Sequence, residues 1–118
     1  MAAQIAAAEI EKRLHRPGLF DAVYTELQKA FGSRFRGLVI YGSAVRGEDR
    51  PDSDIDLMAI LDEPFRRRAD GAEITRAVYP IQRELNRELS IIPVRPESLQ
   101  KSLDPLYQNA RREGLWLR

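Results

Sequence analysis

Cysteine is absent from the 118 residues, and histidine occurs once. The lack of cysteine excludes disulfides and thiolate metal sites. His15 has no cysteine or second histidine with which to hold a metal, so we expect it at a helix end. The alanine-rich start carries Glu9, Glu11 and Lys12 too early for a signal-peptide core or a membrane span. Without a secretory segment, the expected location is the cytoplasm, and no membrane partner is expected.

Neither sign of charge is in clear excess. Nineteen basic and eighteen acidic residues leave a net charge of +1. This balance predicts binding to neither a membrane surface nor nucleic acid, so nucleic acid is not an expected partner. With 43% apolar and 31% charged residues, the chain is not expected to be disordered. Its length fits a single domain, 1–118, with N-terminal helices over 1–34 and a core over 35–118.

A short strand and a polar loop are predicted near the middle of the chain. The β-branched and aromatic residues over 37–41 predict a buried strand that ends at Gly42-Ser43. A glycine there lets the backbone approach a phosphate closely, and Ser43 adds a hydroxyl to the amides of the helical turn that follows. Arg46 could pair with phosphate oxygens through its planar guanidinium, or it could remain in solvent.

The next strand, predicted over 54–61, opens with two carboxylates. Successive strand side chains point to opposite faces, so Asp54 and Asp56 share one face, while Ile55 and Leu57 face the core on the other. Two like charges this close are costly without a bound cation. Mg²⁺ is usually held by one or two carboxylates plus substrate phosphates. The loop and the two aspartates together predict a site for a nucleoside triphosphate and a metal ion.

This combination resembles the signature of the polymerase beta nucleotidyltransferase superfamily. The resemblance rests on Gly42-Ser43, ten intervening residues that include Arg46, Gly47 and Ser53, and then Asp54-Ile55-Asp56. The short length is similar to that of the minimal nucleotidyltransferases (MNT), many of which are encoded beside a HEPN-domain partner. The tail over 105–114 resembles the closing helix and Glu-Gly turn of such domains, although this match is less specific.

The resemblance implies a fold, cofactors and residue roles. The implied fold is α/β, with a small mixed sheet flanked by helices. Asp54 and Asp56 are implied as catalytic residues that bind two Mg²⁺ ions, and Gly42, Ser43 and Arg46 as residues that bind the triphosphate of ATP. In such enzymes the two ions orient the attacking oxygen and help pyrophosphate to leave.

Active members of the superfamily usually draw a third carboxylate from a later strand. A third strand is predicted over 89–94, where Ser90 occupies the convenient inward position. Glu88, two residues earlier, is the nearest candidate for a catalytic carboxylate and shares that face if the strand already runs there. If Glu88 instead ends the preceding helix, it is a surface residue, which is the interpretation we favour. Loss of the third ligand would slow the chemistry without necessarily abolishing nucleotide binding.

Two functions remain open. In the first, favoured interpretation, the chain transfers AMP from ATP to a tyrosine hydroxyl of a HEPN-type partner and acts as an antitoxin, as the resemblance implies. In the second, it is a weak or inactive module that neutralises a HEPN-like partner by direct contact. A transferase for small molecules ranks third, because such enzymes normally need a further domain for the acceptor. Since 118 residues leave no room for that domain, we expect a hetero-oligomer.

The remaining elements follow from periodicity and from glycine and proline positions. The predictions are a helix that stops at 16–18, a helix over about 20–31 that stops at Gly32, a helix over about 66–88, an edge or bulged third strand, short helices from Pro96 and from Pro105 with Asp104 as its N-cap, and a terminal strand over 115–117. Pro80 implies that the long helix kinks or begins later.

Several conspicuous residues have structural explanations. Arg66, Arg67 and Arg68 are expected on a solvated helix start. Arg76, Arg83 and Arg87 are expected to pair with interleaved glutamates on the helix surface. The side chains expected in the core or in an interface, rather than in stacking on bases, are Tyr41, Tyr107 and Trp116.

Overall fold

The computed structural model describes the backbone of residues 2–117 and the side chains of residues 6–117. Its helices are α1 (Ala2–Arg13), α2 (Leu19–Phe31), a 3-10 turn η1 (Gly32–Arg34), α3 (Ser43–Arg46), α4 (Arg67–Gln82), α5 (Pro96–Lys101) and α6 (Pro105–Glu113). Its strands are β1 (Phe35–Tyr41), β2 (Ile55–Leu61), β3 (Leu89–Val94) and β4 (Leu115–Leu117).

The four strands form one mixed sheet in the order β3-β2-β1-β4. β1 runs antiparallel to both β2 and β4, whereas β2 and β3 are parallel. A parallel pair needs a long crossover connection, and α4 supplies it. The mixed α/β fold is confirmed, and so is the edge position of the third strand that Pro93 indicated.

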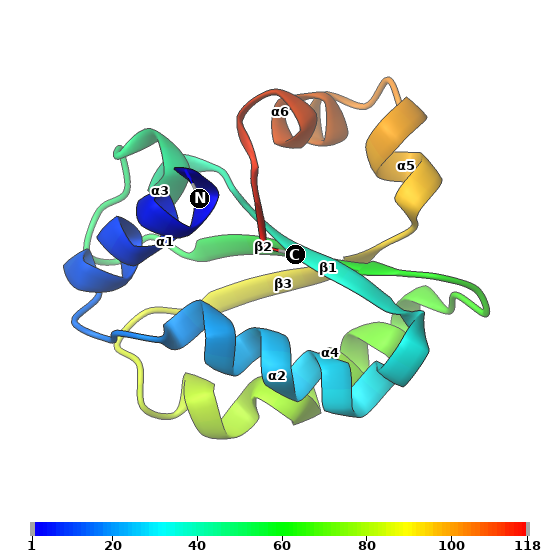
Figure 1. The fold of residues 1–118 in the computed structure, drawn as a ribbon, viewed down its shortest axis with the longest axis horizontal. Helices are drawn as coiled ribbons and strands as arrows, with labels where there is room; N and C mark the ends of the chain where they lie inside the picture. Colours follow the sequence, from blue (N-terminus) through cyan, green and yellow to red (C-terminus); the bar gives the residue numbers. More distant parts are fainter. Residues whose placement is uncertain (1, 118) are drawn as a thin grey trace.

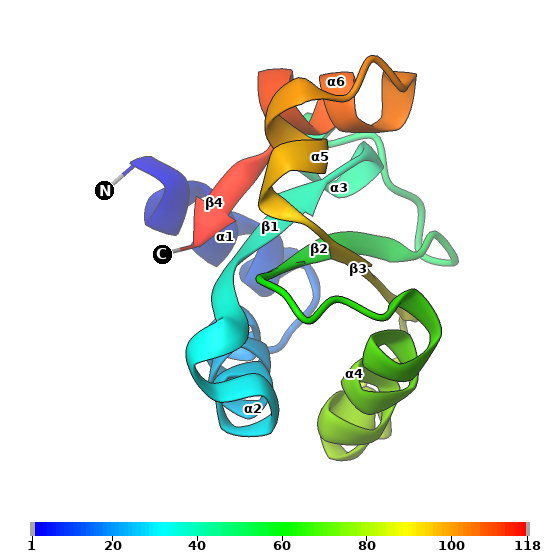
Figure 2. The same ribbon diagram turned by 90° about the vertical axis from the view of Figure 1, so that its right-hand side faces the viewer.

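Helices cover both faces of the sheet. α2 and α4 lie side by side beneath it, and α5 and α6 lie above it (Figure 1). The view from the side shows the same layers, with α1 beside β4 (Figure 2). The core residues of the α2 and α4 side include Leu19, Val23, Leu27, Ile55, Leu57, Ile74 and Val78. The core residues of the α5 and α6 side are Val39, Tyr41, Met58, Ile60, Val94, Leu99 and Ala110.

The long helix ends earlier than the sequence predicted. α4 begins at Arg67, so a later start is wrong, and it ends at Gln82 rather than near 88. Pro80 lies in its last turn, where a missing amide hydrogen weakens the helix. The side chain of Gln82 then replaces helical bonding: its Nε2 donates to the carbonyl of Arg87 at 2.8 Å, and its Oε1 accepts from the amide of Leu89 at 2.7 Å. Residues 83–88 therefore form a loop that leads into β3.

Other predictions about local structure are mostly confirmed. The Asp104 side chain accepts a hydrogen bond from the amide of Leu106 at 2.9 Å, as an N-cap does. The three arginines at 66–68 are exposed. Trp116 is 45% exposed and so is not a core residue. Among residues 2–117, no helix has the length and apolar character of a membrane span.

Candidate active site

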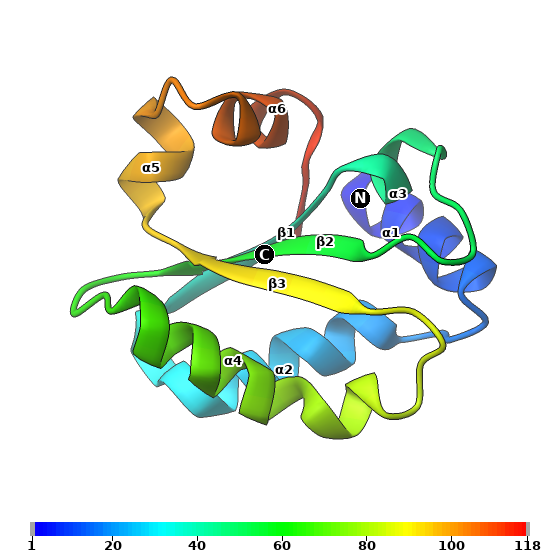
Figure 3. The ribbon, with the colours of Figure 1, turned by 180° about the vertical axis from the view of Figure 1, so that it is seen from behind.

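The two predicted site segments meet at one end of the sheet. β1 ends at Tyr41, opposite Asp56 near the start of β2, and Asp56 is also in register with Ser90 on β3. Asp54 comes immediately before β2 and is exposed. Figure 3 shows this end, where the chain passes from β1 through α3 and a loop back into β2. On the opposite face Ile55 and Leu57 are fully buried, as predicted.

The electrostatics indicate that the two aspartates are close together. Burial raises the pKa of Asp56, the negative charge of Asp54 raises it further, and the positive charge of Arg46 partly opposes both effects. A folded chain keeps such repulsion only where something else offsets it. The donor set, two carboxylates with one partly buried, fits a hard divalent cation.

Gly42 brings the loop against this pair. Its φ of 80° and ψ of −154° form a conformation that only glycine adopts readily. A Cβ atom at this position would lie 2.6 Å from Oδ2 of Asp56. The absence of a side chain therefore lets the backbone lie directly on the carboxylate, and the short helix α3 starts at Ser43 from that point. The structure thus brings Gly42, Ser43 and Asp56 together.

Arg46 belongs to the same region but has carboxylate partners. Its Nε donates to Glu48 at 2.8 Å, and its Nη1 donates to Glu113 at 2.7 Å. These hydrogen bonds raise the pKa of the Arg46 guanidinium. Glu113 ends α6, so the arginine connects the loop to the helix above the sheet. A contact between Arg46 and phosphate stays a prediction.

Glu88 lies in the loop before β3, so the interpretation that it ends the preceding helix is wrong. Its carbonyl accepts from the amide of Ile55 at 2.8 Å, which continues the parallel ladder, while its side chain is exposed as expected. Within residues 2–117, no three histidine, cysteine, aspartate or glutamate side chains are grouped to hold a metal ion. The third carboxylate is thus not grouped with Asp54 and Asp56, and a catalytic role for Glu88 stays a prediction.

Tyr41 lies beside Asp56, and Tyr107 lies near Tyr41. Tyr41 is 9% exposed in the core, as predicted, and Tyr107 of α6 packs against the same cluster. Burial raises the pKa of Tyr41 to about 12, with contributions from the neighbouring Asp56 and Tyr107. Tyr41 therefore stays a neutral phenol beside the carboxylates at neutral pH.

Sequence reasoning missed an ion-paired cluster behind the loop. Arg87 was expected on a helix surface, but it lies outside α4 and donates to Asp49 at 2.9 Å, with side-chain exposures of 12% and 6%. Arg13 of α1 donates to the other oxygen of Asp49 at 3.0 Å. Arg76 does pair with Glu73 as expected. The partners of Asp49 are 36 and 38 residues away in sequence, so no local pattern could have identified them.

The arrangement of β1, the Gly42-Ser43 loop and two aspartates at the start of β2 agrees with a match to a known protein family. The model of the family described as "Nucleotidyltransferase domain" matches residues 24–110. The chain belongs to this family, which confirms the resemblance that the motif indicated. Among curated proteins, no significant match was found.

Solved structures with the same fold are similar at low sequence identity. A candidate nucleotidyltransferase from Sulfolobus solfataricus has a TM-score of 0.59 and 18% identity, with 84% of this chain and 82% of that chain covered. A mutant of the toxin-antitoxin MntA-HpeT has a TM-score of 0.54 and 17% identity, with coverage of 80% and 68%. A toxin-antitoxin structure with AMP-PNP has a TM-score of 0.52 and 15% identity, with coverage of 81% and 70%. These similarities show a shared fold.

Proposed function

We propose that this protein is a Mg²⁺-dependent nucleotidyltransferase that moves AMP from ATP to a hydroxyl group of a partner protein. The observation that carries the proposal is the close approach of the Gly42 backbone to the carboxylate of Asp56, beside Asp54. A backbone that can lie on a phosphate and a repelling pair of carboxylates are of little use to packing, and together they suit a metal-bound triphosphate.

Asp54 and Asp56 would hold the metal. Bound there, Mg²⁺ supplies charge neutralisation and orientation for the displacement at the α-phosphate. The triphosphate itself would be bound by residues of the chain. Gly42 leaves room for the phosphates, and the hydroxyl of Ser43 at the start of α3 can donate to a phosphate oxygen. Arg46, which donates a hydrogen bond to Glu113, can donate to a phosphate oxygen in its place.

The acceptor is proposed to be a tyrosine of a HEPN-type toxin, with this chain as the antitoxin in the cytoplasm. Two observations support a protein acceptor. The MntA-HpeT structures of similar fold are toxin-antitoxin complexes, and one solved toxin-antitoxin of this fold contains AMP-PNP. In addition, residues 2–117 form a single sheet with its helices, which leaves no second domain there for an acceptor. A hetero-oligomer of this chain with its protein acceptor is part of the same proposal.

The intact mass of the product of the neighbouring gene tests this proposal. That product is incubated with this protein, ATP and Mg²⁺, and an added adenylyl mass is expected. Asp56→Asn should abolish the addition. Asp62→Asn makes the same chemical change at the far end of β2, where Asp62 pairs with Arg36 on the surface, and should retain it. The proposed transferase activity is refuted if the mass of the neighbouring gene's product stays unchanged under conditions where the two proteins bind each other.

One observation favours the alternative, a binding module with a weak or inactive site. No third carboxylate joins the two aspartates within the described residues. This alternative predicts a stable complex that neutralises the toxin without any change in its mass. It also predicts that Asp56→Asn neutralises the toxin as well as the unaltered protein does.

A further inference from the structure

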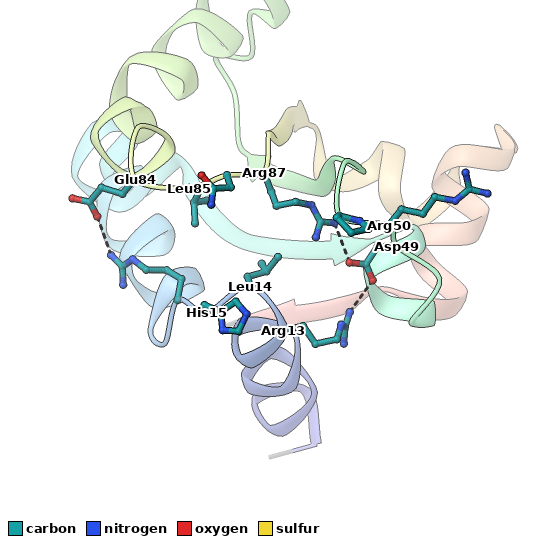
Figure 4. A pocket seen from close by; sticks show the side chains of 11 residues that line it. Arg13, Leu14, His15, Asp49, Arg50, Glu84, Leu85 and Arg87 are labelled. Carbon is teal, nitrogen blue, oxygen red and sulfur yellow. Dashed lines mark hydrogen bonds and ion pairs between the residues drawn. The ribbon is translucent and has the colours of Figure 1, made fainter.

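Asp49 forms ion pairs with both Arg13 and Arg87 at the edge of a pocket (Figure 4). Its side chain is only 6% exposed and receives Arg13 on Oδ1 and Arg87 on Oδ2. Burial alone would raise the pKa of Asp49, but hydrogen bonds from Arg87 and Arg13 outweigh burial and lower it. The carboxylate is therefore ionised and held from both sides at neutral pH.

Each arginine also holds a backbone carbonyl of the candidate site. Arg13 Nη2 donates to the carbonyl of Ala44, in α3, at 2.8 Å. Arg87 Nε donates to the carbonyl of Ser53, the residue before Asp54, at 2.7 Å. Arg13 therefore restrains α3, which begins in the Gly42-Ser43 loop, and Arg87 restrains the backbone just before Asp54.

The segment that joins α3 to β2, residues 47–54, needs such restraint because it contains no helix or strand. Its backbone hydrogen bonds are local: the amide of Glu48 donates to Ser43 and that of Ser53 donates to Arg50. The side chain of Arg87 reaches the carbonyl of Ser53 from the loop before β3. The carbonyl of Ala44, in α3, accepts from Arg13 of α1 in addition to the amide of Gly47. Hydrogen bonds that involve a charged partner are roughly twice as strong as neutral ones. A buried carboxylate between two arginines can thus set the distance between two segments that the sheet alone does not join.

We propose that Asp49 is a positioning residue for nucleotidyl transfer. Acting through Arg13 and Arg87, it keeps the Gly-Ser loop and the aspartate pair at the separation that a metal-bound triphosphate requires. The proposal rests on the proposed function. It also gives α1 a part in building the active site, since Arg13 is the last residue of that helix and reaches the loop.

Asp70 provides a matched control for this role. It is an equally buried aspartate, 7% exposed, that Arg34 holds through two hydrogen bonds of 2.8 and 3.2 Å. It lies in α4 and is linked through Arg34 to Asp62, at the opposite end of the sheet from Tyr41 and Asp56. Asp49→Asn and Asp70→Asn therefore remove comparable ion pairs, one beside the site and one far from it.

Amide hydrogen exchange of the nucleotide-free protein is the first test. Asp49→Asn should speed exchange over residues 42–54 by about tenfold, while Asp70→Asn should leave that segment unchanged. Equal exchange over 42–54 in both variants would overturn the proposal. If Asp49→Asn does not fold, Arg13→Gln replaces it, because Arg13 is 42% exposed and its loss leaves Arg87 on the carboxylate. The same local increase is then expected.

Affinity for ATP with Mg²⁺ is the second test. Asp49→Asn should weaken binding by about tenfold and Asp70→Asn should not, although both should lower the melting temperature. Equal affinities in the two variants would count against a positioning role. If the unaltered protein does not bind ATP with Mg²⁺, the proposed function fails, while the exchange measurement still decides whether Asp49 orders the loop.

Discussion

Replacement of Gly42 by alanine tests the contact on which the candidate site depends. The Gly42 backbone has φ 80° and ψ −154°, and an added Cβ would lie 2.6 Å from Oδ2 of Asp56. Alanine therefore introduces backbone strain and also collides with the carboxylate. The carboxylate must move to relieve the collision, and with it moves a proposed metal ligand.

The two costs can be separated with Gly32. It adopts a similar backbone, φ 59° and ψ −133°, but an added Cβ would meet no atom within 4 Å. Strain alone should cost Gly32→Ala about 1–3 kcal/mol. Gly42→Ala should lose a further 1–3 kcal/mol or so because of overpacking against Asp56. At about 4 °C per kcal/mol for a domain of this size, the two variants should differ in melting temperature by roughly 4–12 °C.

Thermal unfolding and titration with ATP and Mg²⁺ provide the assay. Both variants should melt below the unaltered protein, with Gly42→Ala lower than Gly32→Ala. Only Gly42→Ala should lose nucleotide affinity, because only there is Asp56 displaced. The reasoning is refuted if the two variants melt together and bind ATP equally well, since the close approach of the loop to the carboxylate would then have no consequence.

Three further substitutions follow from the same structure. Asp56→Asn should melt at or above the temperature of the unaltered protein at pH 7, because burial and the nearby charge that raise the pKa of Asp56 make its ionised form unfavourable in the fold. Gly114→Ala should lose about 1–3 kcal/mol in urea unfolding, since its Cβ would collide with the carbonyl oxygen of Ala110 and lie 2.8 Å from Cγ1 of Val39. Asp70→Asn should destabilise the protein at neutral pH and progressively less in acid. Burial would raise the pKa of Asp70, but Arg34 lowers it, so the stabilisation exists above the ordinary value of 3.8 and fades as the pH falls below it.

Each of these three predictions would be contradicted by a specific result. Marked destabilisation by Asp56→Asn would mean that the ionised carboxylate stabilises the folded state, whereas we expect it to be destabilising. An unchanged urea midpoint for Gly114→Ala would mean that the end of α6 and Val39 can both move to accommodate the added methyl group. A constant difference between the unaltered protein and Asp70→Asn from neutral to acid pH would mean that the charge of Asp70 does not matter.

The sequence was sufficient for features that depend on neighbours along the chain. Alternation placed Ile55 and Leu57 in the core, and the glycine, proline and N-cap signals located the ends of several elements. The end of α4 was predicted poorly because the side chain of Gln82 bonds to residues beyond the helix, and no periodicity reveals such a bond.

By itself the sequence determined the family and predicted the candidate site, because the Gly42-Ser43 loop and the pair Asp54 and Asp56 are local patterns with a chemical reason. Only the tertiary structure decided which side chains surround that site. The register of β3 put Ser90 beside Asp56, and long-range ion pairs put Arg46 against Glu113. Contacts of this kind depend on strand order and helix docking, which join residues far apart in sequence, so they could be known only once the chain was folded.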